Sequence, residues 1–251
     1  MSKTKFGFKT VNHELKQGLV NNVFASVASK YDIMNDVMSF GMHRLWKKIF
    51  IDNIQLIDGI KILDMASGTG DIACKINEKA AKYGINCDFT LADINANMLK
   101  QAQDRIINEN LNTECFKFHL INGENTGLEN NHYDYYTIAY GIRNFTDLSR
   151  GLSEAYRVLK PGGKFLCLEF SALTDGMLKE AYDFYSFNLI PKFGKIITGD
   201  EASYQYFVES IRIFPKPKDF AQMIEDNNFT NVKFQNLFQG ITTIYSAEKP
   251  K

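Results

Sequence analysis

A short strand, a glycine turn and the start of a helix follow one another between Lys61 and Ala73. The strand ends on an acid, Asp64, and the turn contains Gly68 and Gly70. Glycine lets the backbone approach a ligand closely and adopt conformations that other residues avoid. The first N–H groups of a helix have no intrahelical partner and can face an electron-rich ligand. The segment predicts a cradle for a nucleotide cofactor, and a glycine turn without a ligand is the plainer alternative.

Two classes of cofactor fit this turn. Gly68, Gly70 and Ala73 match the G-x-G-x-x-G/A fingerprint of dinucleotide-binding proteins. Asp64, Ala66 and the same glycines also match the D-x-[GA]-x-G-x-G loop of S-adenosylmethionine (AdoMet) methyltransferases. The turn alone does not choose between the two.

A second acid, Asp93, stands 23 residues after Gly70, at the end of the next predicted strand. An acid there accepts hydrogen bonds from ribose hydroxyls in both classes, or caps a helix. The negative charge of Asp64 separates the classes, because it suits a sulfonium cofactor with an amino-acid tail and repels a pyrophosphate. The Lys160-Pro-Gly-Gly163 turn also resembles one in class I methyltransferases.

Composition excludes several kinds of function. Lys+Arg and Asp+Glu each number 29, so the net charge is zero and we expect no nucleic-acid binding. The four histidines are scattered, and their spacing supports no metal site. No C-x-x-C pair occurs, which is typical of a reduced compartment, and the cysteines are Cys74, Cys87, Cys115 and Cys167.

Alternating strands and helices organise the chain. Strands are predicted at about 61–65, 89–93, 116–120, 135–140 and 165–169, and two more close the chain at about 231–237 and 241–247. Helices with one apolar face lie between them. This alternation predicts an α/β fold with a Rossmann-like, doubly wound parallel sheet.

One domain, residues 19–251, is expected after a flexible polar arm over residues 1–18. Within it, residues 19–50 are expected to form a helical lid or ordinary core. Residues 176–214 are rich in aromatic side chains, and we expect their helices to break at Pro191 and Gly194. The N-terminus lacks the apolar segment of a signal peptide, and no run of about 18 apolar residues predicts a transmembrane helix.

Further motifs make the chain similar to the ubiquinone/menaquinone biosynthesis C-methyltransferase family, a group of class I AdoMet-dependent enzymes. The resemblance extends from about Val23 to Glu248. It implies a seven-stranded, mostly parallel sheet with an antiparallel C-terminal strand. The motifs are Phe24–Asp36, Asp64–Asp71, Ala92–Asn95, Tyr140–Phe145, Tyr156–Gly163, Leu168–Ser171 and Tyr204–Arg212.

The resemblance assigns cofactor contacts beyond Asp64, Gly68 and Gly70. It implies that Thr69 contacts AdoMet and that Asp93 holds the ribose. Asn122 and Gly123 are implied at the adenine, where the family usually has Asn-Ala. Many relatives carry a serine where this chain has Ala139, so one hydroxyl contact is absent.

The implied reaction is methylation of a ring carbon in a polyprenyl benzoquinol, a demethylmenaquinol or both. Arg143 and Asn144 are the candidates at the reacting centre. Guanidinium stays protonated, so Arg143 would stabilise a phenolate or orient a water; a salt bridge with a carboxylate is the structural alternative. Tyr31 is expected to close the cavity from the N-terminal helices, or to be a core tyrosine.

The aromatic segment 176–214 is expected to bind the isoprenoid tail, with Tyr204 and Arg212 contributing to the pocket or packing in the core. A substrate dissolved in the bilayer implies a cytoplasmic bacterial protein, peripherally associated with the inner face of the membrane. A homodimer and attachment to a quinone-biosynthesis assembly are suggested by the resemblance alone.

Two alternatives stay open from the sequence. An NAD(P)-dependent oxidoreductase would use a relay such as Tyr156-x-x-x-Lys160, although this pair leads directly into the Pro-Gly-Gly turn. A non-catalytic AdoMet-binding scaffold is the other alternative. The intact glycine loop, Asp93, Arg143 and Asn144 favour an enzyme over a scaffold.

Overall fold

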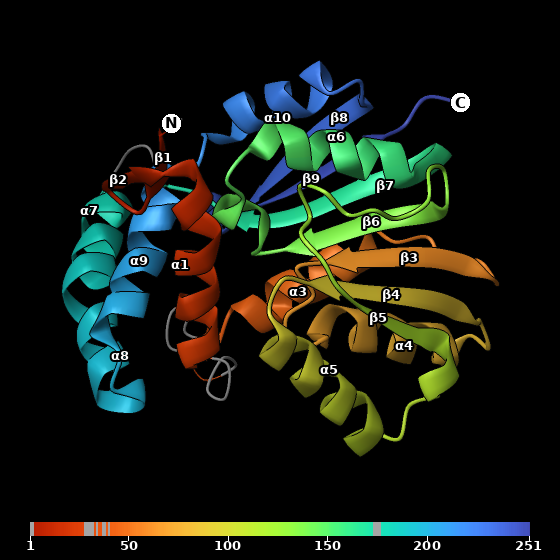
Figure 1. Ribbon diagram of the computed structural model, residues 1–251, viewed down its shortest axis with the longest axis horizontal. Helices are drawn as coiled ribbons and strands as arrows, with labels where there is room; N and C mark the ends of the chain where they lie inside the picture. Colours follow the sequence, from red (N-terminus) through yellow and green to blue (C-terminus); the bar gives the residue numbers. More distant parts are fainter. Residues whose placement is uncertain (1–2, 28–32, 34, 37–38, 40, 173–176) are drawn as a thin grey trace.

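The computed structural model describes residues 3–27, 33, 35–36, 39, 41–172 and 177–251. In this part of the chain a seven-stranded sheet has the order β5-β4-β3-β6-β7-β9-β8 (Figure 1). The last strand, β9, is antiparallel to both of its neighbours, β7 and β8, and the other pairs are parallel. The predicted Rossmann-like sheet is confirmed. Its strands are β3 Ile60–Met65, β4 Cys87–Asp93, β5 Phe116–Leu120, β6 Tyr133–Ala139, β7 Leu159–Phe170, β8 Thr230–Leu237 and β9 Thr242–Glu248.

Helices cover both faces of the sheet. Ile62 of β3 packs into one apolar cluster and Leu63 into the other, as the alternation of side chains along a strand requires. One face carries α3 His43–Asp52, α4 Asp71–Lys82 and α5 Ala96–Asn108, and the other carries α6 Leu148–Val158 and α10 Pro217–Asp226 (Figure 1). Single 3₁₀ turns are η2 Thr113–Cys115, η3 Ile142–Asn144 and η5 Phe238–Gly240.

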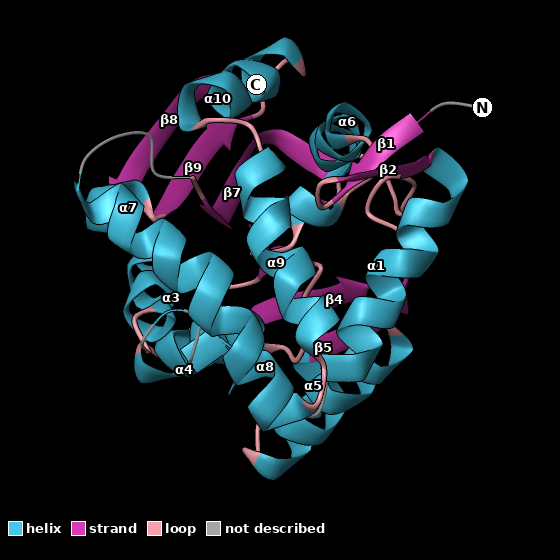
Figure 2. Ribbon diagram, turned by 90° about the vertical axis from the view of Figure 1, so that its left-hand side faces the viewer, coloured by secondary structure: helices cyan, strands magenta, loops and turns pink. Residues whose placement is uncertain are grey.

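A third group of helices lies beyond the carboxyl ends of the parallel strands (Figure 2). It contains α1 His13–Val27, α7 Met177–Phe184, the π-helix η4 Tyr185–Leu189, α8 Ile190–Thr198 and α9 Glu201–Ile213. Helix α9 packs against both α1 and α8, so segments from the two ends of the chain meet over the edge of the sheet.

Residues 3–18, which were expected to belong to a flexible polar arm, contain regular secondary structure. Strands β1 Lys3–Phe6 and β2 Lys9–Asn12 form an antiparallel hairpin, and α1 begins at His13. The hairpin packs on α9: the Phe6 ring stacks on Tyr206 at 4.2 Å, and the Phe8 N–H donates to Glu209 Oε2 at 2.9 Å. These contacts come from distant sequence, which is why local polarity was misleading.

The expected break at Gly194 is wrong, because α8 continues through this residue. A Cβ at position 194 would lie 2.4 Å from the ring of Tyr204, so the glycine permits close packing of α8 on α9. The helical backbone does not end at Pro191 either, because α8 follows the π-helix η4 directly, although the change from a π-helix to an α-helix next to this proline is an irregularity.

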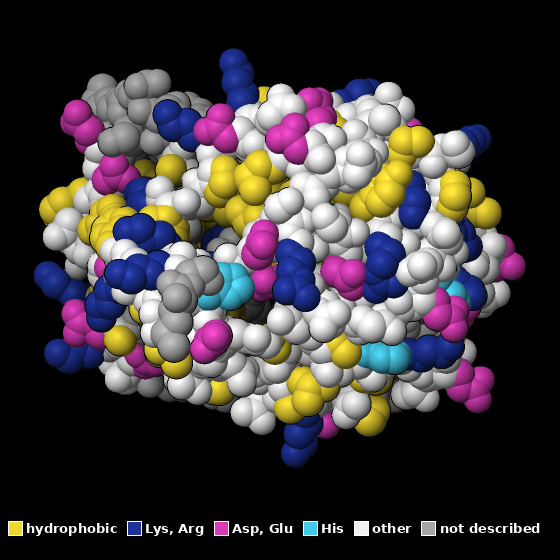
Figure 3. Space-filling model, turned by 45° about the horizontal axis from the view of Figure 1, so that its top comes forward, with side chains coloured by type: hydrophobic (Ala, Val, Ile, Leu, Met, Phe, Trp, Pro, Cys, Tyr) yellow, Lys and Arg dark blue, Asp and Glu magenta, His cyan; other side chains and the backbone are white. Residues whose placement is uncertain are grey.

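Charged side chains of both signs are interspersed over the face shown in Figure 3, and apolar side chains form several small patches among them. None of the helices in the described residues combines the length and the apolar character needed to cross a membrane.

Candidate active site

A cavity of about 750 Å³ opens at the carboxyl ends of β3, β4 and β6, with α1 along one side. Gln17, Val20 and Phe24 of α1 contribute to its wall. The cavity brings together residues that lie far apart in the sequence and were predicted from separate motifs. Those residues are Gly68, Asp93, Asn122, Gly123 and Asn144.

The glycine loop and Asp93 are tied to each other. Asp93 ends β4, and its two carboxylate oxygens accept hydrogen bonds from the Gly68 N–H at 2.9 Å and the Asn95 N–H at 2.8 Å. Burial raises the pKa of Asp93 above its ordinary value. Gly70 has a φ of 75° and caps α4, and a Cβ there would lie 3.0 Å from that of Ala102. The loop therefore needs glycine at this position.

Gly123 explains one departure from the family pattern. A Cβ on this residue would lie 2.5 Å from the ring of Phe145, which also lines the cavity. A Cβ on Gly151 would lie 2.3 Å from another atom of the same ring. Phe145 therefore occupies a slot between two glycines, and an alanine at position 123 requires the ring to move.

Helix α1 is attached to the loops that line the cavity. Asn95 Nδ2 donates to Asn21 Oδ1 at 2.7 Å, and Asn122 Nδ2 donates to Gln17 Oε1 at 3.5 Å. Lys16 is buried, and its Nζ donates to the carbonyl oxygen of Phe145 at 2.6 Å. These contacts hold α1 across the cavity in the position expected of an N-terminal lid.

A smaller cavity of about 360 Å³ adjoins the first and shares Ala66, Gly68, Ala139 and Tyr140 with it. Thr69 lines this second cavity, and Ala139 presents a methyl group to both cavities. Asp64 lines it too, at the end of β3.

The carboxyl group of Asp64 is buried, with 1% of its surface exposed. Thr137 Oγ1 donates to Asp64 Oδ1 at 2.8 Å, whereas Oδ2 has no hydrogen-bond partner among the described residues. Burial raises the pKa of Asp64 to about 7. The carboxyl therefore has an oxygen available to a donor in the cavity.

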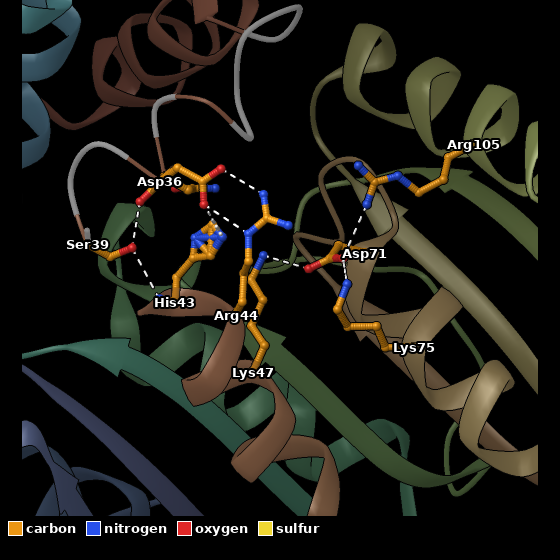
Figure 4. Close-up of polar contacts among 9 residues, drawn as sticks. Asp36, Ser39, His43, Arg44, Lys47, Asp71, Lys75 and Arg105 are labelled. Carbon is orange, nitrogen blue, oxygen red and sulfur yellow. Dashed lines mark hydrogen bonds and ion pairs between the residues drawn. The ribbon is translucent and has the colours of Figure 1, made fainter. Parts of the chain in front are cut away.

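Lys47 and Asp71 also line the second cavity, and Figure 4 shows further basic side chains around Asp71. Lys47 of α3 is buried, and its Nζ lies 2.8 Å from Asp71 Oδ2 in the first turn of α4. Lys75 and Arg105 also contact Asp71. Although burial opposes it, the Lys47 and Lys75 ammonium groups hold the pKa of Asp71 well below its ordinary range. Sequence reasoning missed Lys47, because no motif indicates that α3 packs beside the glycine loop.

His43 lies one turn before Lys47 and is absent from the walls of both cavities. Its Nε2 is 3.4 Å from Asp36 Oδ1, and Ser39 Oγ accepts a hydrogen bond from its backbone N–H. Burial, followed by the nearby Lys47 ammonium, lowers the pKa of His43 to about 4. His43 is therefore a neutral structural residue at neutral pH.

Arg143 forms a salt bridge with a carboxylate, which was the alternative to a role at the reacting centre. Its Nη1 lies 2.8 Å from Glu169 Oε1, and both side chains are buried. Nη1 also donates to the Tyr140 carbonyl oxygen, and the guanidinium stacks 4.6 Å from the ring centre of Phe207. Arg143 lines neither cavity, although its neighbour Asn144 lines the large one.

Asn144 does line the large cavity, as expected for a residue at the reacting centre. The Tyr206 hydroxyl donates to Asn144 Oδ1 at 3.0 Å. The carbonyl end of the amide is therefore engaged by α9, and the Nδ2 group is left as a hydrogen-bond donor.

Tyr204 and Arg212 do not line either cavity. Tyr204 is fully buried against Gly194 of α8. Arg212 pairs with Asp183 and lies 5.5 Å from the ring centres of Tyr182 and Phe187. Tyr31 lies outside the described residues.

The Tyr156 and Lys160 pair lies at the wrong edge of the sheet for an oxidoreductase relay. Lys160 is the second residue of β7, at the amino edge of the parallel strands, and its Nζ pairs with Asp134 at 2.7 Å. Both cavities are at the carboxyl edge. The pair therefore has no access to the candidate site.

Sequence comparison gives a family match along nearly the whole chain. Residues 9–249 match the ubiE/COQ5 methyltransferase family. A Rickettsia bellii protein named ubiquinone/menaquinone biosynthesis C-methyltransferase UbiE is 52% identical over 249 residues, covering 99% of this chain and 100% of the relative. The Rickettsia prowazekii protein of the same name is 51% identical with the same coverage.

Solved structures share the fold at low sequence identity. Phosphoethanolamine N-methyltransferase 2 of Haemonchus contortus, in complex with S-adenosyl-L-methionine, has a TM-score of 0.60 and 17% identity. The match covers 82% of this chain and 52% of that one. A Thermotoga maritima SAM-dependent methyltransferase has a TM-score of 0.58 and 17% identity, over 90% of this chain and 99% of that one. With this fold and the match over residues 9–249, the chain belongs to the ubiE/COQ5 methyltransferase family.

Proposed function

We propose that this protein transfers a methyl group from AdoMet to a ring carbon of a polyprenylated quinol, in ubiquinone or menaquinone biosynthesis. The observation that carries the proposal is the large cavity, which joins Gly68 and Asp93 to Asn144. Family membership and the names of the UbiE relatives support the same reaction.

The residues present suit AdoMet. In this proposal Asp93 binds the ribose and Asn122 and Gly123 contact the adenine, which is supported by their shared position in the wall of the large cavity. The unpartnered oxygen of Asp64 suits a cationic group, and Thr69 faces the same cavity. When bound, AdoMet supplies an electrophilic methyl group on a sulfonium.

On the protein side, the reaction requires a positioned quinol whose hydroxyl has lost its proton. We assign Asn144 as a catalytic residue, because its Nδ2 can donate to the phenolate oxygen as negative charge develops. We assign Arg143 as a positioning residue: it binds the Tyr140 carbonyl and Glu169 and so fixes the turn that carries Asn144. The cavity wall would have to hold the ring carbon close to the methyl group, because reacting atoms must be roughly 3–3.5 Å apart.

The isoprenoid tail of such a substrate favours peripheral association with the inner face of the bacterial membrane from the cytoplasm. Exposed apolar side chains on α7 and α8 support this assignment: Phe184 is 63% and Ile196 79% exposed. Lys192 and Lys195, also exposed, flank Phe193 and suit anionic lipid. The homodimer and the quinone-biosynthesis assembly stay predictions.

Mass spectrometry of quinones from a strain that lacks this protein tests the function. We expect a demethylated quinone to accumulate, and its ring identifies benzoquinol or naphthoquinol as the substrate. Restoration of the methylated quinone by the wild-type chain is the control. Unchanged quinone composition would refute the proposal.

A further inference from the structure

The small cavity beside the glycine loop is lined by both acidic and basic residues. Lys47, Asp64 and Asp71 all contribute to its wall, and the residues Lys47 and Asp64 are at most 5% exposed. The small cavity shares four lining residues with the large one, Gly68 and Tyr140 among them. We therefore expect the polar end of a ligand in the large cavity to reach Lys47 and Asp64.

Asp64 requires a donor. Asp64 Oδ2 is buried and lacks a hydrogen-bond partner among the described residues, while Oδ1 accepts from Thr137. A buried carboxylate oxygen without a partner is unfavourable, so this oxygen favours a ligand with N–H donors.

Lys47 can supply a cation without leaving an uncompensated charge behind. Three cationic side chains, those of Lys47, Lys75 and Arg105, converge on the single carboxylate of Asp71 (Figure 4). If Lys47 turns to a ligand, Asp71 keeps two cationic partners. Of the three cations, only Lys47 lines the cavity.

We infer that Lys47 binds the carboxylate of the cofactor's amino-acid tail, while Asp64 binds its ammonium group. An α-amino acid carries both charges on one carbon, which matches a cavity lined by the Lys47 ammonium group and the unpartnered oxygen of Asp64. The inference rests on the proposed AdoMet site and deepens it, since Lys47 then distinguishes the intact cofactor from a nucleoside that lacks the tail.

Calorimetry with two ligands tests this role. S-adenosylhomocysteine carries the amino-acid tail, and 5′-methylthioadenosine lacks it. The full-length protein is titrated as wild type, Lys47→Met and Lys75→Met; Lys75 also pairs with Asp71 but does not line the cavity. Lys47→Gln serves as a second variant with a polar side chain.

We expect Lys47→Met and Lys47→Gln to weaken S-adenosylhomocysteine binding about 10- to 100-fold, as for loss of a charge-assisted hydrogen bond. Binding of methylthioadenosine should change less than about threefold, and Lys75→Met should affect neither ligand strongly. Unchanged S-adenosylhomocysteine affinity in both Lys47 variants, or equal loss for both ligands, would overturn the inference. Failure of the wild type to bind either ligand would instead overturn the proposed cofactor.

Discussion

The Tyr206 hydroxyl donates a hydrogen bond to Asn144 Oδ1, and this fixes which end of the Asn144 amide faces the cavity. We expect Asn144→Ala to lower kcat on a short-chain demethylated quinol about 10²- to 10³-fold, because it removes a donor to the developing phenolate. The affinity for S-adenosylhomocysteine should change little.

Tyr206→Phe is the matched variant for this test, because it removes only the hydroxyl that orients the amide. Its loss in kcat should be smaller, about tenfold or less, as for one neutral hydrogen bond. An Asn144→Ala variant with wild-type kcat would rule out the assigned role.

Asp64 makes the stability of the cofactor-free protein depend on pH. The unfolded carboxyl ionises above its ordinary pKa of 3.8, whereas burial raises the pKa in the folded protein to about 7. Between these values the folded state keeps a proton that the unfolded state has lost, so stability falls as the pH rises. Asp64→Asn removes this loss and should stabilise the protein at pH 8 by up to about 4 kcal/mol, at about 1.4 kcal/mol for each pKa unit.

Urea unfolding of both proteins between pH 4 and pH 8 measures the effect. The difference between them should be small near pH 4 and largest near pH 8. Asp104→Asn, at an exposed acid on α5, is the control. Parallel pH curves for wild type and Asp64→Asn would contradict the expectation.

At the scale of elements, replacing glycine by alanine is expected to change stability in opposite directions at two helical positions. Gly194→Ala places a methyl group 2.4 Å from the Tyr204 ring, so overpacking should destabilise the protein by about 1–3 kcal/mol. Gly18→Ala in α1 meets no atom within 4 Å and should stabilise it by up to about 1 kcal/mol, because alanine favours the helix.

Urea unfolding of the two variants beside wild type gives both values. Stabilisation by Gly194→Ala would show that α8 and α9 are not closely packed at this point. The comparison isolates packing from helix propensity, because the substitution is identical.

The strands and the helices between them were predictable because their apolar periodicity is local. Ile62 and Leu63 point to opposite faces whatever the rest of the chain does. The β1–β2 hairpin was not predictable in this way, since Phe6 gains its partner, Tyr206, from a helix 200 residues away.

In the candidate site too, the residues in local motifs were predictable and the contacts between distant elements were not. Gly68, Asp93, Asn122 and Asn144 were found because each follows a strand, and parallel strands end at one edge of the sheet. The ion pair of Arg143 and the position of Lys47 were not found. Both depend on which side chains other elements bring near them, and a motif carries no such information.

At the scale of the whole molecule, α7 and α8 form an apolar surface with basic residues. We expect the protein to float with liposomes that contain anionic lipid and less with neutral ones, since apolar burial and charge both contribute to binding. Ile196→Glu should lower the bound fraction at least tenfold, because it removes an apolar group and adds a negative charge.

Ile107→Glu provides the matched control, because Ile107 is 61% exposed on α5, apart from this surface. Absence of the wild-type protein from the lipid fraction, with and without a quinol, would count against membrane association. Equal loss for the two variants would place the lipid contact elsewhere.

The attachment of α1 has a consequence for the timing of the reaction. Asn21, Gln17 and Lys16 each bond to a loop of the large cavity. If release of the spent cofactor requires α1 to move away from the cavity, the bonds of α1 to Asn95 and Asn122 oppose that step. Product release would then limit turnover, and weakening one of these side-chain bonds should raise kcat while it loosens cofactor binding.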